Sequence, residues 1–432
     1  MILRTLAVLW SLCAAALLFA PDTAAAQTPR ICLDDSKQAL AQFAQFHELA
    51  TRNLYHTRSV ARLRQPFVDL ASDAAAYVGP REHAGLLIFA WDERDLCLFF
   101  WAQQSRTPDD YVYVRRSGGR AELLAQARLL DEIVRAPKAV ANRLPRKRSM
   151  TVLEAPAPPT GDVAAVTAIL SRLLFPPELR RELASVKELS IVPVGPIATI
   201  PLFMLEPLDD ARTSPELFSI NILTLMEDIQ APMRWQHAAG DTVLVIGNPA
   251  ARDAEWDLPD LPGAEAEARF AHRLFGGTML AGREATSERF EALAPEADLI
   301  VIAAHGVADS VEPLDGSFLA LAGGRLTPRQ IQSLELAKHP LVILSACQSG
   351  LGQALDAGVI GLARAFQIAG ATDTVMSLWS IDDEATRFLM ERFYRQLVTH
   401  PPAEALRRAT LATKEHYPDP AQWAAFALFG GP

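Results

Sequence analysis

The sequence predicts an α/β protein whose central sheet is largely parallel and is covered by helices on both faces. Two short apolar runs, residues 298–304 and 340–346, have the length and the β-branched content of strands buried on both sides. Helical patterns alternate with such runs in the second half of the chain, which is typical of β-α-β units with right-handed crossovers. Catalytic groups in sheets of this kind gather at the carboxyl ends of the strands.

The first half of the chain mixes both patterns. Apolar residues recur at helical spacing over 34–78, after Asp34, Asp35 and Ser36 as a capping start, which predicts one or two helices. The other elements expected here are strands at 85–90, 96–101, 111–115 and 189–194 and helices at 120–135, 163–175 and 177–184.

The second half alternates more regularly. Thr327 is expected to cap a helix that has Pro328 at its first position. Besides the two apolar runs, the elements expected here are strands at 242–246, 317–321 and 374–379 and helices at 264–274, 287–293, 358–368 and 383–397.

Reactive side chains follow both apolar runs. His305 comes after the first run and Cys347 after the second, so both are expected at one edge of the sheet, where a thiol and an imidazole form a nucleophile with its base. Taken singly, such a cysteine is typical of a buried core residue and such a histidine of a loop. Gly306 after the histidine and the polar turn 348–350 after the cysteine favour the catalytic interpretation.

Seven segments of the chain resemble one family when they are taken in order. They are residues 189–203, 245–249, 261–267, 304–306, 344–350, 377–386 and 423–432. Together with the spacing of 42 residues between His305 and Cys347 (347 − 305), they resemble the CHAT domain, a bacterial caspase-like family in the caspase and separase group of cysteine peptidases. The resemblance extends from about Ala84 to the last residue.

The resemblance implies a caspase-like three-layer α/β/α sandwich with two tandem lobes. A degenerate pseudo-caspase lobe is expected at 84–235 and a catalytic caspase-like lobe at 236–432, with a helical cap at 27–83. CHAT proteins commonly carry tetratricopeptide repeats in the position of this cap, but the sequence has no 34-residue period there.

The expected activity is that of an endopeptidase that forms an acyl-enzyme. Cys347 would attack as thiolate, His305 would transfer protons, and the backbone N–H groups of Gly306 and Cys347 would hold the oxyanion. Neither a metal nor any other cofactor is expected. Asp356 and Asp383 are candidates for a substrate pocket that favours Arg or Lys, although the acidic residues at 382–384 are also typical of a helix start, and the positive Arg387 argues against strict Arg specificity.

Two other functions remain open. The same fold could be a catalytically silent scaffold that binds a cell-envelope partner through the N-terminal helices, or the same cysteine could transfer an acyl group to an amine or a thiol. The expected partner of an enzyme is a protein or peptide substrate. The net charge of −10 argues against nucleic acid, whose binding needs a basic surface.

The first 26 residues are typical of a secretory signal peptide, with Arg4, an apolar core at 6–20 and small residues before Gln27. The alternative is an uncleaved anchor, but the apolar core is short for a bilayer. A periplasmic or extracellular enzyme is therefore expected. Removal of Cys13 leaves three cysteines, of which Cys32 and Cys97 are expected to form a disulfide; the alternative is that all three are reduced and buried.

Overall fold

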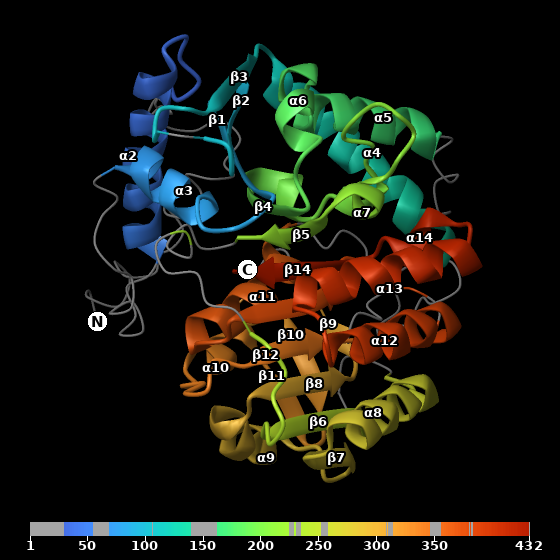
Figure 1. The fold of residues 1–432 in the computed structure, drawn as a ribbon. Helices are drawn as coiled ribbons and strands as arrows, with labels where there is room; N and C mark the ends of the chain where they lie inside the picture. Colours follow the sequence, from blue (N-terminus) through green and yellow to red (C-terminus); the bar gives the residue numbers. More distant parts are fainter. Residues whose placement is uncertain are drawn as a thin grey trace, which may run out of the picture.

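One mixed sheet runs through the whole described part of the molecule. The computed structural model describes residues 30–54, 69–105, 107–139, 162–223, 229, 235–251, 258–307, 309, 314–345, 356–379, 381 and 383–431. Within them, eleven strands lie in the order β3-β2-β1-β4-β5-β14-β13-β12-β8-β6-β7 (Figure 1). Their bounds are β1 Ala84–Trp91, β2 Leu96–Ala102, β3 Val112–Arg116, β4 Glu188–Val192, β5 Ser219–Ile222, β6 Val243–Pro249, β7 Thr278–Gly282, β8 Leu299–Ala303, β12 Leu341–Leu344, β13 Asp373–Ser377 and β14 Phe426–Gly430.

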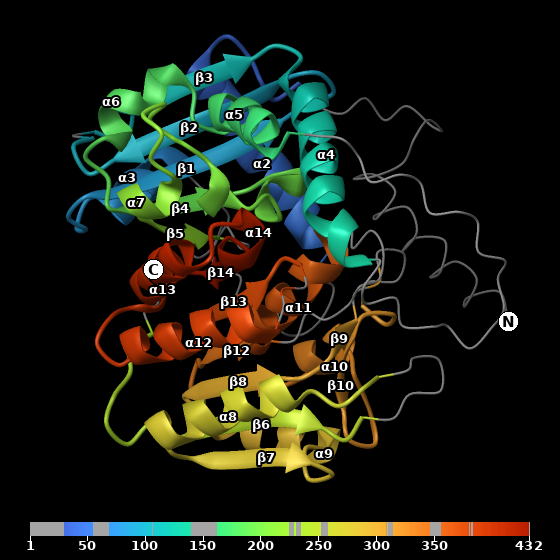
Figure 2. The same ribbon diagram turned by 90° about the vertical axis from the view of Figure 1, so that its right-hand side faces the viewer.

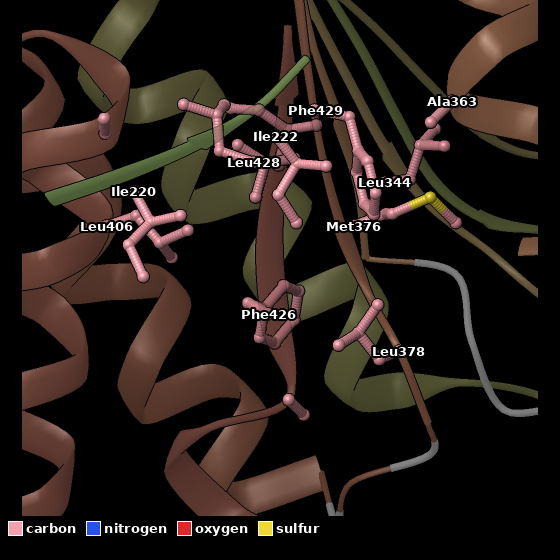
Figure 3. Packing of buried hydrophobic residues seen from close by; sticks show 14 of the residues in the cluster. Ile220, Ile222, Leu344, Ala363, Met376, Leu378, Leu406, Phe426, Leu428 and Phe429 are labelled. Atoms are coloured by element: carbon pink, nitrogen blue, oxygen red, sulfur yellow. The ribbon is translucent and has the colours of Figure 1, made fainter. Parts of the chain in front are cut away.

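The two halves of this sheet run in opposite directions and meet at β14. In the first half, β1, β4 and β5 are parallel. In the second half, β6, β8, β12 and β13 are parallel. β14 is parallel to β5 but antiparallel to β13. Figure 3 shows Ile222 of β5 beside Leu428 of β14, and both belong to one hydrophobic core that continues across the junction.

Helices cover both faces of the first half. Side chains alternate along β1, so that Phe89 lies in one core and Ile88 in the other. The first core is formed with α4 (Gly119–Ala139) and α5 (Val163–Leu174), and the second with α2 (Ser36–Leu54) and α3 (Leu70–Val78) (Figure 2). The three-layer α/β/α arrangement expected from the sequence is confirmed.

Helices also cover both faces of the second half. On one face lie α8 (Pro262–Phe275), α12 (Asp383–Leu397) and α13 (Pro402–His416), and on the other α9 (Ser287–Leu293), α10 (Pro328–Gln332) and α11 (Asp356–Ala369) (Figures 1 and 2). Thr327 caps α10 as expected: its hydroxyl accepts from the N–H of Gln330, whose side chain accepts from the N–H of Thr327. No helix within the described ranges is long and apolar enough to span a bilayer.

A disulfide fastens the N-terminal segment to the sheet. Cys32, just before α2, is bonded to Cys97 in β2, and their Cα atoms are 5.5 Å apart. Both residues are fully buried. This is the pairing expected from the sequence.

Some elements differ from those predicted. The strands β5, β7 and β14 and the helix α13 are present without having been predicted. The segment predicted as one helix at 177–184 is a 3-10 turn, Pro177–Leu179, followed by the single turn of α6, Arg180–Leu183. Of the region predicted as helical at 34–78, residues 55–68 lie outside the described residues, and the rest forms α2 and α3.

Candidate functional site

The candidate site lies at the edge of the sheet where β8, β12 and β13 end. Because these strands are parallel, the residues that follow them meet at one edge. Ala304 and His305 follow β8, Ser345 follows β12, and Ser377 is the last residue of β13. The N–H of Ser345 donates to the carbonyl of Ile302, so the pairing of β8 and β12 continues to this edge.

His305 is held in one orientation by a main-chain carbonyl. The side chain is buried, with 6% exposure, and its Nε2 lies 2.7 Å from the carbonyl oxygen of Pro259. A carbonyl oxygen can only accept, so Nε2 carries the hydrogen in this bond, and Nδ1 is the ring nitrogen that takes up a proton in the neutral imidazole.

The turn that carries Pro259 is fixed by β6. The side chain of Asn248, near the end of that strand, accepts from the N–H of Leu261 at 2.9 Å. Leu261 is the N-cap of α8, so the turn before this helix is tied to the sheet. The group that orients Nε2 of His305 is thus a backbone carbonyl, which no side-chain pattern could reveal.

A small second sheet holds the backbone after His305. It is formed by β9 (Gly306–Val307), β10 (Phe318–Leu321) and β11 (Gly324–Leu326). The N–H of Ala320 donates to the carbonyl of His305 at 2.9 Å, and the next pair is Gly306 with Leu319. Hydrogen-bonded and non-hydrogen-bonded pairs alternate in an antiparallel ladder, so the N–H of Gly306 points away from β10. This orientation suits the role in oxyanion binding predicted for Gly306.

A pocket lies beside this edge, between α8, α12 and the strand ends. It contains one buried carboxylate, Glu267, and one guanidinium, Arg387, whose side chain is 51% exposed and has its Nη1 3.6 Å from Glu391. The pocket is lined by Leu261, Gly263, Ala264, Glu267, Ala304, Ser345, Ser377, Ile381, Thr386, Arg387 and Phe426.

Glu267 connects three elements around this pocket. Its Oε2 accepts from the hydroxyl of Ser345 at 2.8 Å, and its Oε1 accepts from the hydroxyl of Tyr394 in α12 at 2.6 Å. Burial, and then the charge of Glu267 and the hydrogen bond to it, raise the pKa of Tyr394 well above its usual value, so the tyrosine stays a donor. Sequence reasoning missed this role, although Glu267 lies in the segment 261–267 that carries the family resemblance.

The structure does not describe the side chains of the other predicted site residues, Cys347, Asp356 and Asp383. Cys347 belongs to the residues 346–355, which the structure does not describe. Asp356 and Asp383 begin α11 and α12, but their side chains are not described, so their role in substrate binding stays a prediction. Among the described residues, no three His, Cys, Asp or Glu side chains gather closely enough to hold a metal ion.

Comparison with known sequences identifies one family. A sequence profile described as the CHAT domain matches residues 164–431, which is more than half of the chain. Tetratricopeptide repeat protein 28 of Homo sapiens is 26% identical in an alignment that covers 43% of this chain and 9% of that protein, and its Mus musculus counterpart gives the same values. The chain therefore spans less than a tenth of the length of these relatives.

Comparison with solved structures shows the fold. Saccharomyces cerevisiae separase, in a complex with securin, superposes with a TM-score of 0.53 at 11% identity, over 93% of this chain and 34% of that chain. The Arg-specific cysteine proteinase gingipain R gives a TM-score of 0.40 at 13% identity, over 62% of this chain and 67% of that chain. At this identity the likeness to separase concerns the fold, and the chain spans about a third of the separase chain.

Proposed function

Since this chain belongs to the CHAT domain family, we propose that it is a cysteine endopeptidase in which Cys347 is the nucleophile and His305 is the general base. His305 has the surroundings that this role needs: it is buried at the end of β8, and the carbonyl of Pro259 orients its ring through Nε2. Nδ1 is then the nitrogen that accepts the thiol proton.

The register of β8 against β12 is the observation that carries the proposal. Leu341 faces Leu299, so facing residues are 42 positions apart (341 − 299). His305 and Cys347 are separated by the same 42 positions (347 − 305). Because the separation of His305 and Cys347 equals the offset between facing residues of the two parallel strands, we expect the imidazole and the thiol at the same edge of the sheet.

The proposed reaction begins with transfer of the thiol proton of Cys347 to Nδ1 of His305. The thiolate attacks the scissile carbonyl carbon, and the N–H groups of Gly306 and Cys347 bind the oxyanion. The C–N bond breaks as the imidazolium returns its proton to the departing amine. Water, deprotonated by His305, then attacks the thioester carbon, releases the carboxylic acid product and restores the thiol.

We propose a protein or peptide as substrate and a compartment outside the cytoplasm as the place of action. Residues 1–26 support export because they have the pattern of a signal peptide. The buried disulfide between Cys32 and Cys97 also supports it, since such bonds persist in oxidising compartments.

Labelling with an acyl-fluoride or chloromethylketone probe tests the proposal. The exported wild-type protein should label at Cys347, Cys347→Ala should not label, and His305→Ala should label at least about a hundredfold more slowly because it lacks the base. A folded protein whose Cys347 is inert toward every such probe would be a scaffold. If probe-reactive protein releases product from a peptide library only when an amine or thiol acceptor is added, it is a transferase.

A further inference from the structure

A buried carboxylate lies beside the end of β12, in a position that hydrolysis by itself does not require. Glu267 is 2% exposed and lines the pocket with Ala304 and Ser345, which adjoin His305 and the end of β12. Burial of a carboxylate costs free energy unless strong hydrogen bonds compensate for it, and replacement of such a group by apolar side chains is often neutral or stabilising. Its presence at this place therefore calls for a specific role.

The hydrogen-bond partners of Glu267 indicate that role. One donor is Ser345, the first residue after β12 and the second residue before Cys347. A second donor is Tyr394, which is buried in α12. O–H groups that donate to a carboxylate form short, strongly directional bonds, so Glu267 fixes the direction of the Ser345 side chain and of the backbone that carries it.

We propose that Glu267 is a positioning residue: through Ser345 it sets the direction in which the chain leaves β12 toward Cys347, and hence the alignment of the thiol with His305. This inference rests on the proposed peptidase function. Catalysis depends on the alignment of the reacting groups, and a misplacement of about 1 Å costs up to about a hundredfold in rate. In this role Glu267 acts through Ser345.

The two oxygens of Glu267 provide a matched pair of variants. Ser345→Ala removes the hydroxyl on the side of the nucleophile, and Tyr394→Phe removes the hydroxyl on the side of α12. Both variants delete one hydrogen bond to the same carboxylate, so a purely structural role predicts similar effects of both on labelling by the probe. A positioning role predicts that Ser345→Ala reduces the labelling rate of Cys347 at least about tenfold. In that case Tyr394→Phe, although less stable, labels within about twofold of wild type.

A double-variant comparison assigns the effect to Glu267. Glu267→Gln keeps the size of the side chain but removes its charge, and it should slow labelling to a similar extent as Ser345→Ala. Because both variants break the same interaction, Glu267→Gln/Ser345→Ala should label no more than about twofold more slowly than either single variant. Ser345→Thr, which keeps a hydroxyl, should recover most of the rate. With a peptide substrate, the loss should appear in kcat, with KM changed by less than about twofold.

The pH dependence of Cys347 alkylation by iodoacetamide separates the two roles. If Glu267 and Ser345 only stabilised the fold, their replacement would not change the pKa of the thiol. In wild type, a thiol aligned with His305 should react as thiolate well below the ordinary cysteine pKa of about 8.5. In Ser345→Ala and Glu267→Gln, this acid-side reactivity should be lost and the apparent pKa should return toward the ordinary value.

Three results would overturn the inference. One is folded Ser345→Ala that labels at the wild-type rate. Another is additive effects of the two variants. The third is Glu267→Gln that labels normally but no longer cleaves peptides with Lys or Arg before the scissile bond, since Glu267 would then bind substrate. A different result would contradict the proposed function: wild-type Cys347 that is not labelled by any of the activity-based probes and that reacts with iodoacetamide no faster than an ordinary thiol. The inference would then fail as well.

Discussion

Removal of the disulfide between Cys32 and Cys97 should destabilise the protein by a calculable amount. The bond closes a loop over a sequence separation of 65 residues. In the chain-entropy description of cross-links, a loop of that length restricts the unfolded chain by about 4 kcal/mol at 25 °C. We therefore expect the Cys32→Ala/Cys97→Ala variant to lose about 3 to 5 kcal/mol in free energy of unfolding.

Equilibrium urea unfolding followed by circular dichroism measures this loss. The double variant should also carry Cys347→Ala and be compared with Cys347→Ala alone, so that no free thiol can exchange with the disulfide. Cys347→Ala should itself unfold near the midpoint of wild type, which serves as the control. Because Cys32 and Cys97 are both fully buried, a reductant should reduce the disulfide only when denaturant is present.

Thiol counting decides whether the reasoning holds. Denatured, unreduced mature protein should contain one free thiol, from Cys347. Three free thiols would show that the pair is not bonded in the protein. A single free thiol combined with a loss below about 1 kcal/mol in the double variant would refute the loop-entropy argument for this chain.

Three further predictions concern stability. Burial raises the pKa of Tyr77 to about 12, so the folded state keeps a proton that the unfolded state loses above pH 10. This group alone should remove about 2 to 3 kcal/mol of unfolding free energy between pH 10 and 12, so urea unfolding of Tyr77→Phe should show a loss smaller than that of wild type by about this amount. Thr327→Ala breaks the capping box of α10 and should cost about 1 kcal/mol in thermal unfolding, whereas Thr327→Ser should cost little. Gly276 and Gly277 both have positive φ, but only a Cβ at Gly277 meets the backbone of Val243, so Gly277→Ala should lower the melting temperature more than Gly276→Ala; equal shifts would contradict this.

The sequence could predict the elements whose pattern is local. The runs at 298–304 and 340–346 became β8 and β12 because a strand buried on both faces needs an unbroken series of apolar, mostly β-branched residues. The bounds of α9 and α12 match the predicted ranges 287–293 and 383–397, since each has an amphipathic helical period.

The missed elements depend on partners that are distant in the chain. β14 forms between β5 and β13, more than 200 residues after β5, and the segment 423–432 that contains it indicates the family and not a strand. In the site, His305 was predicted from its position after a strand. Its orientation by the carbonyl of Pro259 was not, because every residue has a carbonyl and only the fold selects one.

The position of β14 also bears on how the protein is synthesised. It follows the other ten strands of the sheet along the chain, yet it occupies the middle of the sheet. Until β14 is in place, β5 and β13 therefore each end their half as an unpaired edge, and such edges readily recruit strands from other chains. We expect a folding chain of this kind to be prone to aggregation until its final strand joins the halves.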